Sequence, residues 1–488
     1  MSAGLGIAQA CVLNPDPNHC ANNGQECGTA MVCDPCTSTA SSAMGCVPVA
    51  LAKCPEALET STIGPTDAGT LTTTGPTTTI NPTEDVTIGP ETTMTDTDTD
   101  STTGPPPPCD EPDGTYGETC TGNNPFCVGG QCVPCNNGVQ LTTCDEAPLT
   151  VCADSGACVL CSSEEPDACT GGTPVCDDAT HTCVRCSEHA QCGPSACNLF
   201  TGACVGGMVV DVGGGLMFTT LGAAVAAVGA GGGGTIIVHA GTYNETITVS
   251  GDEVAFLANP GDGVEWQRTM GAGAPQLRVT GGATVLIDEI EFRGNTSVVD
   301  AAVRVDGNMS RLWMDRSTMA QNAGVAVSTE GSGELVLRNC FVAGANDLAT
   351  VNVETNATAD LQYTTVGANL GNAVGLVCDG SGPVTASDSI ILSRGMADVD
   401  CVTFTADHSA GNSMLPGTDN VSVGATSTTW FGGYSTGDFH LSGAGQDAIM
   451  EIGEWNEGNP LDDPSVDIDG DPRAGVEGMM EFPGADLP

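Results

Sequence analysis

The hexapeptide Ile287-Asp-Glu-Ile-Glu-Phe292 opens a series of five short segments in which apolar and polar residues alternate. Their second residues are at positions 288, 315, 338, 364 and 388, which are 27, 23, 26 and 24 residues apart. Alternation is typical of β-strands, and recurrence at a nearly fixed step is typical of a solenoid whose coils stack around one core. The later segments are Met314–Met319, Leu337–Val342, Tyr363–Ala368 and Ser387–Leu392.

A second series of alternating strands lies between these segments, again at steps of 22 to 26 residues. Parallel strands of an α/β fold need a crossover helix between them, and no helical pattern separates the two series. The C-terminal half therefore predicts an all-β fold, a right-handed parallel β-helix (solenoid) over residues 206–445 with a cap or tail at 446–488. The second series comprises Val303–Val305, Val325–Val327, Val351–Val353 and Val374–Leu376.

The start of this half predicts a short apolar-faced helix at Phe218–Val228 and then two β runs in Thr235–Val249. The helix and the coil pattern I-x-V-x-x-G-x-Y-x-E-x-I-x-V resemble the opening of pectin-lyase-like β-helix proteins. The resemblance implies that the helix plugs the open end of the solenoid.

The tail resembles the closing pattern of many bacterial right-handed β-helix surface proteins. The matching residues include Asp438-Phe-His-Leu441, Asp467-Ile-Asp-Gly-Asp-Pro-Arg473 and Gly484-Ala-Asp486. The chain departs from that pattern at Met450 and at Phe482-Pro483, which weakens the acid-to-arginine clamp that the resemblance implies for the cap.

The first two hundred residues hold most of the 26 cysteines. In 109–205, cysteines at 132, 158, 183 and 204 recur at steps of 26, 25 and 21 residues, which predicts an array of small units. These units resemble the Cys-rich repeats of large secreted bacterial surface proteins. CxxC pairs leave zinc as an alternative, but further cysteines fall between every pair. The pattern therefore favours disulfides and an oxidising compartment.

Three cysteines come later in the chain. Cys378 and Cys401 are 23 residues apart, about one coil, so we expect them to be stacked and bridged. Cys340 aligns with Ile290, Val366 and Ile390 in the repeat and is expected to be a buried free thiol.

The N-terminal part predicts a residual signal segment at 1–10, a Cys-rich module at 11–58 and a disordered Thr/Pro-rich stalk at 59–108. Ala8-Gln9-Ala10 fits a cleavage site, and the residues before Cys11 resemble a bacterial lipobox. Lipidation of Cys11 and simple cleavage both remain open. No run of eighteen apolar residues occurs, so no membrane span is expected. We expect an extracellular protein or one on the outer surface of a bacterium, lipid-anchored if Cys11 is modified.

The net charge of −50 comes from 61 acidic residues against 11 basic ones, of which Lys53 is the one lysine. Such a surface repels phosphate backbones and anionic lipid headgroups. Nucleic acid is therefore excluded as a partner, and a monomer that binds an extracellular polysaccharide or a cell-surface component is expected.

The resemblance raises carbohydrate enzymes, but fold alone assigns no activity. The later catalytic blocks of pectin methylesterases and polygalacturonases have no counterpart, and no catalytic residue is assigned. A lyase needs a basic side chain, for which Arg304, Arg311, Arg316, Arg338 and Arg394 are candidates. One-coil spacing predicts that Arg311 pairs with Glu334 and Arg338 with Asp315 instead.

Two binding sites remain as candidates. Asp467, Asp469 and Asp471 alternate around Gly470 like calcium ligands, although no bidentate Glu follows, and pairing with Arg473 in a solvated cap is the alternative. Trp313 points away from the core side chains of its strand and is the best candidate for stacking on a sugar. The histidines His239, His408 and His440 are taken as turn or cap residues.

These features favour a non-catalytic adhesion or polysaccharide-binding protein that needs no cofactor, with calcium as the one candidate ion. A calcium-assisted polysaccharide lyase and a structural envelope component are the alternatives.

Overall fold

The structure is a computed structural model. It describes residues 31–33, 46–48, 109, 115–116, 120, 122–136, 138, 144, 149–162, 165, 168–268, 274–297, 300–344, 349–369, 373–395, 397–424, 430–456 and 463–488. The chain divides into two units, 1–100 and 101–488. In the first, β1 (Met31–Cys33) pairs antiparallel with β2 (Cys46–Pro48). The predicted signal segment, the Thr/Pro stalk and Cys11 lie outside the described residues.

The second unit begins with four Cys-rich repeats, each of which holds four cysteines. Within every repeat the first cysteine is bonded to the third and the second to the fourth. Each CxxC pair, such as Cys132 and Cys135, consists of the last cysteine of one repeat and the first cysteine of the next. Because the two cysteines belong to different disulfides, the zinc alternative is wrong for residues 109–204. The disulfides are 109–127, 120–132, 135–152, 144–158, 161–176, 169–183, 186–197 and 192–204.

Each repeat carries a small antiparallel β element. The elements are β3 (Thr115–Tyr116), β4 (Phe126–Val128) and β5 (Gln131–Val133), then β6 (Val151–Cys152) with β7 (Cys158–Val159), β8 (Val175–Asp177) with β9 (Thr182–Val184), and β10 (Cys197–Asn198) with β11 (Ala203–Cys204). A 3₁₀ helix, η5 (His189–Cys192), is inserted in the last repeat.

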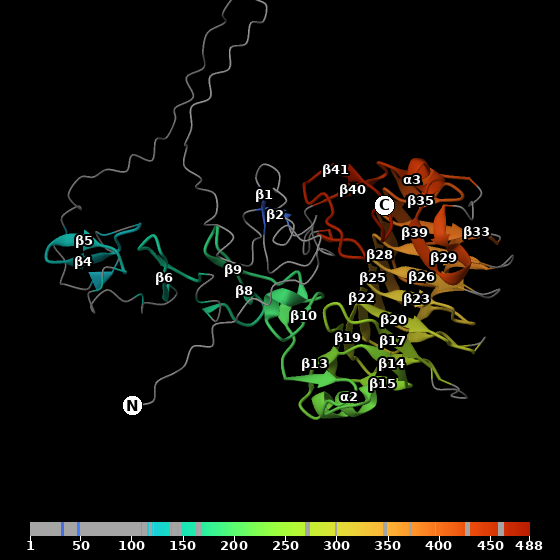
Figure 1. The fold of residues 1–488 in the computed structure, drawn as a ribbon, viewed down its shortest axis with the longest axis horizontal. Helices are drawn as coiled ribbons and strands as arrows, with labels where there is room; N and C mark the ends of the chain where they lie inside the picture. Colours follow the sequence, from blue (N-terminus) through green and yellow to red (C-terminus); the bar gives the residue numbers. More distant parts are fainter. Residues whose placement is uncertain are drawn as a thin grey trace, which may run out of the picture. The chain divides into compact units, whose positions relative to one another are not determined.

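The rest of the unit is a parallel β-solenoid of about eight turns, which confirms the predicted fold class (Figure 1). Three sheets run along it. The first sheet contains β12 (Met208–Val212), β13 (Gly233–Val238), β16 (Glu253–Ala258), β19 (Thr284–Asp288), β22 (Arg311–Asp315), β25 (Glu334–Arg338), β28 (Thr358–Gln362), β31 (Val384–Ser387), β34 (Phe404–Asp407) and β36 (Gly417–Thr418).

The second sheet contains β14 (Gly241–Asn244), β17 (Val264–Gln267), β20 (Ile290–Arg293), β23 (Thr318–Ala320), β26 (Phe341–Gly344), β29 (Thr365–Ala368), β32 (Ile390–Ser393), β35 (Ala410–Gly411) and β37 (Val421–Ser422). The third sheet contains β15 (Ile247–Ser250), β18 (Leu277–Thr280), β21 (Val303–Val305), β24 (Val327–Thr329), β27 (Ala349–Glu354), β30 (Val374–Asp379) and β33 (Ala397–Cys401). Among the described residues, no helix has the length and apolar character of a membrane span.

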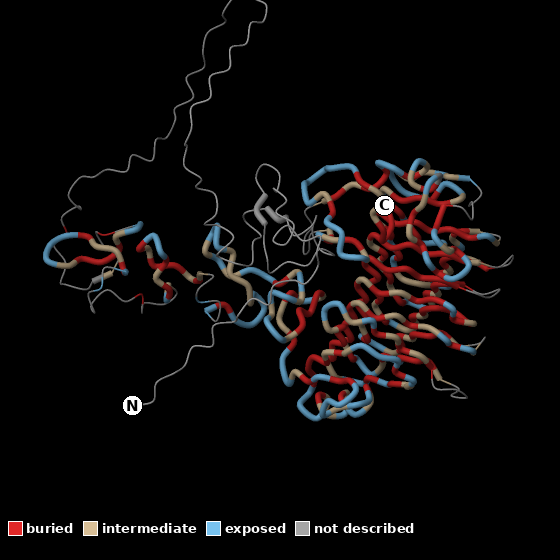
Figure 2. Tube along the Cα trace, viewed as in Figure 1, coloured by how far each residue is buried: buried red, intermediate tan, exposed pale blue. Residues whose placement is uncertain are grey.

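The inward side chains of the three sheets form one continuous core. Buried residues accordingly recur along the strands of the solenoid (Figure 2). Trp266 is fully buried in it, with its ring centroid 5.3 Å from that of Phe256 and 5.1 Å from that of Phe292. Helix α2 (Leu221–Gly229) adds Leu221, Ala224 and Val228 to this core at the N-terminal end.

The acidic residue of the first coil motif holds this capping helix in place. The Glu245 carboxylate accepts hydrogen bonds from Leu221 N at 2.7 Å and from Gly222 N at 2.9 Å. A carboxylate at a helix N-terminus satisfies unpaired N–H groups and opposes the positive end of the helix dipole. The coil motif thereby fixes the plug to the solenoid.

Each predicted segment of the first series is two strands that meet at a sharp bend. From Glu289 onward, one non-glycine residue in each coil lies in the left-handed backbone region between the first and second sheets. We name these residues the corner column: Glu289 (φ 57°), Arg316 (41°), Asn339 (51°), Tyr363 (45°), Asp388 (47°), His408 (45°) and Asp419 (47°). A positive φ costs an L-amino acid roughly 1–3 kcal/mol of conformational free energy. Such a conformation persists where the surrounding structure holds the residue in place.

The strand pairing corrects part of the predicted register. Arg338 pairs with Gln362, and Gln362 with Ser387, so the alignment was wrong by two residues at 364 and by one at 388. In the third sheet Val327 pairs with both Val303 and Val351. The predicted Val325 was therefore two residues out of register.

The residue after each corner is buried and polar in five coils. Cys340 belongs to this column with Ser317, Thr364, Ser389 and Ser409, and not with Val366 or Ile390 as the spacing suggested. Their side chains donate to nearby carbonyls, as Ser389 Oγ does to Ser387 O at 2.8 Å and the Cys340 thiol does to Arg338 O at 3.2 Å. This ladder satisfies backbone groups that the bend takes out of regular pairing.

The C-terminal segment covers the outer face of the second sheet. Phe341 and Ile390 of that sheet pack in one apolar cluster with Phe431, Tyr434 and Phe439 of the segment. Its elements are β38 (Phe431–Gly433), η6 (Tyr434–Thr436), β39 (Asp438–Leu441), α3 (Ala444–Ile449), β40 (Gly453–Trp455) and β41 (Met479–Glu481).

We predict that Trp266→Ala lowers the free energy of unfolding by about 3–5 kcal/mol, because it leaves a cavity between Phe256 and Phe292. Denaturant unfolding followed by circular dichroism measures the loss. Val402→Ala, at a side chain that is 97% exposed, is the matched control and should change the value by less than about 0.5 kcal/mol. Equal effects of the two substitutions would contradict a dry, continuous core.

Candidate functional site

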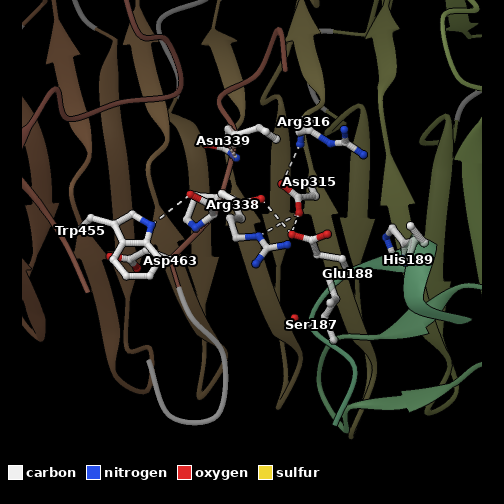
Figure 3. A pocket seen from close by; sticks show the side chains of 14 residues that line it. Ser187, Glu188, His189, Asp315, Arg316, Arg338, Asn339, Trp455 and Asp463 are labelled. Carbon is white, nitrogen blue, oxygen red and sulfur yellow. Dashed lines mark hydrogen bonds and ion pairs between the residues drawn. The ribbon is translucent and has the colours of Figure 1, made fainter. Parts of the chain in front are cut away.

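A pocket of about 330 Å³ lies where three parts of the second unit meet. The last Cys-rich repeat supplies Glu188 and His189, the corner region supplies Arg316, and the C-terminal segment supplies Trp455 and Asp463 (Figure 3). The remaining lining residues are Ser187, Ala190, Leu199, Asp315, Arg338, Asn339, Pro464, Ser465 and Val466.

One wall of the pocket exists because the last repeat is packed on the outer face of the first sheet. Ala196 N donates to Thr235 Oγ1 at 2.9 Å, and the Phe200 and Trp313 rings meet edge to face with centroids 5.3 Å apart. Leu199 and Val205 of the repeat share a buried apolar cluster with residues of that sheet. The contact between the repeat and the sheet combines a hydrogen bond with apolar packing. This combination defines the position of the repeat on the sheet.

The opposite wall is closed by a polar contact between distant parts of the chain. Ser465 Oγ donates to Glu188 Oε1 at 2.9 Å, which joins the C-terminal segment to the last repeat. Asn339 Nδ2 donates to Val466 O at 2.8 Å and fixes the same segment to the corner column.

Both arginines of the pocket are neutralised by carboxylates. Arg338 Nε donates to Asp315 Oδ2 at 2.8 Å, and both side chains are buried. This pair was predicted from the one-coil spacing and is confirmed, as is the pair of Arg311 with Glu334 at 2.9 Å. Buried ion pairs of this kind are held by hydrogen-bond geometry more than by net charge attraction.

Arg316 makes a second, forked ion pair beside the first. Its guanidinium contacts Asp288 at 2.5 Å and Glu289 at 2.6 Å. Burial lowers the pKa of Arg316, but Asp288 and Glu289 outweigh it and leave that pKa raised. Burial raises the pKa of Asp288 despite the neighbouring guanidinium. Neither arginine is therefore free to act as a base.

His189 is the pocket residue that has a buried hydrogen-bonding atom without a partner among the described residues. Its Nδ1 accepts from Cys197 N at 3.1 Å, so the proton of the neutral ring is on Nε2. Nε2 is buried and has no hydrogen-bond partner among the described residues. Burial also lowers the pKa of His189, which favours the neutral ring. His189 thus holds one buried N–H donor that lacks an acceptor among the described residues.

Trp313 does not lie where the sequence suggested. Its side chain points outward from the solenoid, as predicted, but it is only 6% exposed. Phe200 covers it, and the Arg338 guanidinium lies 5.6 Å from its ring centroid. The expectation of an exposed sugar platform at Trp313 was wrong, because the docking of the last repeat could not be inferred from the strand pattern.

The three aspartates of the predicted calcium loop have separate roles. Asp467 is fully buried, and its carboxylate accepts from Asp469 N at 2.9 Å, Asp471 N at 2.8 Å and Leu487 N at 2.9 Å. The Asp469 carboxylate instead faces His440, 2.8 Å from its Nε2. Among the described residues, Asp467, Asp469 and Asp471 do not form a joint group of ligand atoms. Calcium at this loop stays a prediction.

The other predicted residues are placed as follows. Cys378 of β30 and Cys401 of β33 are bonded in a disulfide with a Cα–Cα distance of 4.6 Å. Cys340 is a buried free thiol whose pKa burial raises. Of the remaining arginines named as lyase candidates, Arg304 pairs with Glu330 at 2.5 Å, and Arg394 contacts Asn369 and the Tyr434 ring.

Little in the sequence indicated the pocket. Glu188 and His189 belong to the last repeat, whose 21-residue step was shorter than the others, and this was the one signal that the repeat differs. The histidines His239 and His408, taken as turn or cap residues, each contact acids: His239 contacts Asp211 at 2.9 Å, and His408 contacts Glu454 at 2.9 Å.

Comparisons with known proteins add little to this geometry. Residues 93–210 match a family of unknown function, DUF8331. No curated protein matches the chain in sequence. The structure of a pectin methylesterase from Aspergillus niger is similar with 15% sequence identity and a TM-score of 0.26. The match covers 45% of this chain and 69% of that chain. The structure of the Escherichia coli protein YbhC is similar with 11% sequence identity and a TM-score of 0.24. The match covers 57% of this chain and 85% of that chain. Because these TM-scores are far below 0.5, function rests on the residues of the chain itself.

We predict that Asp315→Asn lowers the free energy of unfolding by about 3–5 kcal/mol, because it leaves the Arg338 guanidinium buried beside a neutral group. Glu334→Gln is the matched control on the same two strands, since the Arg311–Glu334 pair has side chains 40% and 39% exposed. That substitution should cost less than about 1 kcal/mol. Thermal and denaturant unfolding of both variants tests the difference, and similar losses would contradict the burial of the Asp315 pair.

Proposed function

We propose that the protein binds a neutral extracellular polysaccharide without catalysis, and that the pocket beside His189 is its binding site. The observation that supports the proposal is the buried, unpaired Nε2–H of His189. An unsatisfied buried donor costs roughly 1–3 kcal/mol, and a ligand oxygen that accepts from it removes the cost. A sugar hydroxyl supplies that oxygen.

The other groups of the pocket fit a ligand with many hydroxyls and no charge. The guanidiniums of Arg316 and Arg338 are occupied by carboxylates, so they offer no free cation to a uronate. Glu188 and Asp463 bring acceptor oxygens to which hydroxyls donate, and Trp455 adds an apolar ring. The volume of 330 Å³ is at the lower end of the range of about 300–1,000 Å³ for small-molecule pockets, which suits one or two sugar units.

The disulfides fix the kind of environment in which this site would work. The eight bridges of residues 109–204 and the Cys378–Cys401 bridge indicate an oxidising compartment. We place the protein on the outer surface of a bacterium or in its surroundings, with lipidation of Cys11 as the proposed anchor. In this arrangement the N-terminal part is a spacer that holds the β-helix away from the envelope.

A carbohydrate-active enzyme is the second candidate. Asp288 and Asp315 are paired neighbours on successive coils, and burial raises the pKa of Asp288, as a general acid requires. The ion pairs with Arg316 and Arg338 oppose this role, because they hold both carboxylates in place as charged acceptors. Release of reducing ends or unsaturated products from a glycan would favour the enzyme over the binding protein.

We predict that His189→Ala weakens binding to a neutral oligosaccharide at least tenfold, because the ligand loses the donor that has no other partner. A glycan array identifies the oligosaccharide, and isothermal titration calorimetry measures the dissociation constant. Acidic oligosaccharides of matched length should bind more weakly than neutral ones.

His181→Ala is the matched control, since His181 belongs to the preceding repeat and contacts the Cys161 carbonyl instead of the pocket. Its dissociation constant should equal that of the unchanged protein. Binding that survives His189→Ala, or that is strongest for uronates, would contradict the assignment. No binding to any glycan would favour a structural envelope component.

A further inference from the structure

A second group of polar side chains lies in the C-terminal segment, and none of its members lines the pocket. His440 of β39, Asp469 of the predicted calcium loop and Asp486 near the C-terminus each bring one ligand atom to within 4.8 Å of the other two. The three residues come from separate stretches of the chain. A nitrogen and two carboxylate oxygens that converge in this way match the ligand types of a divalent transition metal.

The imidazole of His440 is held in the orientation that metal-binding histidines have. Its Nδ1 lies 2.5 Å from Asp438 Oδ1, and its Nε2 faces Asp469 Oδ2 at 2.8 Å. The Phe341 ring meets the imidazole edge to face with centroids 5.0 Å apart. A carboxylate that accepts the Nδ1 proton leaves the Nε2 lone pair for a metal, which is the usual arrangement of a carboxylate, a histidine and a metal ion.

Asp486 adds a buried carboxylate to this group. Its side chain is 5% exposed, and Leu441 N donates to its Oδ2 at 2.5 Å. No side chain among the described residues donates a hydrogen bond to it. Its ligand oxygen lies within 4.8 Å of the ligand atoms of His440 and Asp469, of which only His440 can be positive. A buried carboxylate among other carboxylates is costly unless a positive charge balances it.

The carboxylates are also prearranged. Asp469 is positioned by its own N–H, which donates to the buried Asp467 carboxylate, and Leu487 N donates to the other oxygen of Asp467. The aspartates of the predicted loop therefore act differently from one another. Asp467 builds the turn, and Asp469 is presented by it.

We propose that His440 Nε2, Asp469 and Asp486 bind one divalent transition-metal ion of the zinc class, with Asp438 as the positioning residue for the imidazole. Zinc accepts a nitrogen and carboxylate oxygens in a site of low coordination number. Calcium prefers six to eight oxygen ligands, and an imidazole nitrogen is therefore a poor ligand for it. The ion replaces the proton between His440 and Asp469, and it fastens the C-terminal residues to β39. This site does not depend on the proposed sugar binding.

The test uses the full chain, stripped with EDTA and then titrated with zinc chloride in a calorimeter, with calcium and magnesium chloride as parallel arms. Zinc should bind at least a hundredfold more tightly than calcium. His440→Gln should remove one zinc equivalent, and Asp438→Asn should weaken that equivalent about 10–100-fold. His408→Gln, which changes a histidine paired with Glu454, is the matched control and should keep it.

Asp469→Asn, at an exposed side chain, serves as a second variant that leaves the buried Asp486 intact, and it should also lose the equivalent. Circular dichroism in EDTA checks that each variant is folded. No zinc binding by the unchanged protein, zinc binding that is the same in His440→Gln, or calcium binding tighter than zinc binding would each overturn the proposal.

Discussion

The bend between the first and second sheets is the constraint on which the rest of the molecule depends. From Glu289 to Asp419, each coil turns there through one non-glycine residue with a positive φ. Such a residue is stable only when its neighbours hold it. Parallel pairing on both sides and the buried ladder of Ser317, Cys340, Thr364, Ser389 and Ser409 provide that support, and identical bends then stack from coil to coil.

The same bend makes the outer surface where the other parts of the chain attach. The Asn339 side chain donates a hydrogen bond to Val466 O, and the Tyr363 hydroxyl donates one to the Asp463 carboxylate. The Asp388 carboxylate accepts a hydrogen bond from Glu454 N at 2.8 Å. The C-terminal segment therefore follows the corner column. The last Cys-rich repeat packs on the neighbouring first sheet. The pocket forms where these two additions meet beside Arg316. A regular solenoid face alone would offer no such enclosed site.

Charge is the reason why we propose an uncharged partner for this surface. The chain carries a net charge of −50, and most of its arginines on the β-helix are tied to carboxylates. Even the pocket, with two guanidiniums, keeps them in ion pairs. In the proposed binding mode, an anionic polysaccharide would meet repulsion at the pocket without a free guanidinium to compensate it, whereas hydroxyl groups would meet acceptors and the His189 donor. The same excess of carboxylates is what a bound metal would balance at His440, Asp469 and Asp486.

The sequence predicted the features that repeat and missed those that depend on tertiary contacts. Alternation and spacing predicted the β-helix and the Arg338–Asp315 pair, because both follow from stacking equivalent positions. The capping helix was predicted from its apolar face and from the family resemblance. The bends were missed, since an alternating run such as Ile287–Phe292 looks like one straight strand. Trp313 was misjudged and His189 was overlooked, because both environments depend on how the last Cys-rich repeat packs. That repeat lies more than a hundred residues before Trp313 in the chain. His440, Asp469 and Asp486 meet only through the folding of the cap.

The docking of the last repeat on the first sheet is tested most directly by fluorine NMR of the protein labelled with 5-fluorotryptophan. With Phe200 covering Trp313, the Trp313 resonance should show no shift between H₂O and D₂O, and Phe200→Ala should create one. A Trp313 resonance that already senses solvent in the unchanged protein would mean that the repeat is not docked and that the pocket beside His189 does not exist.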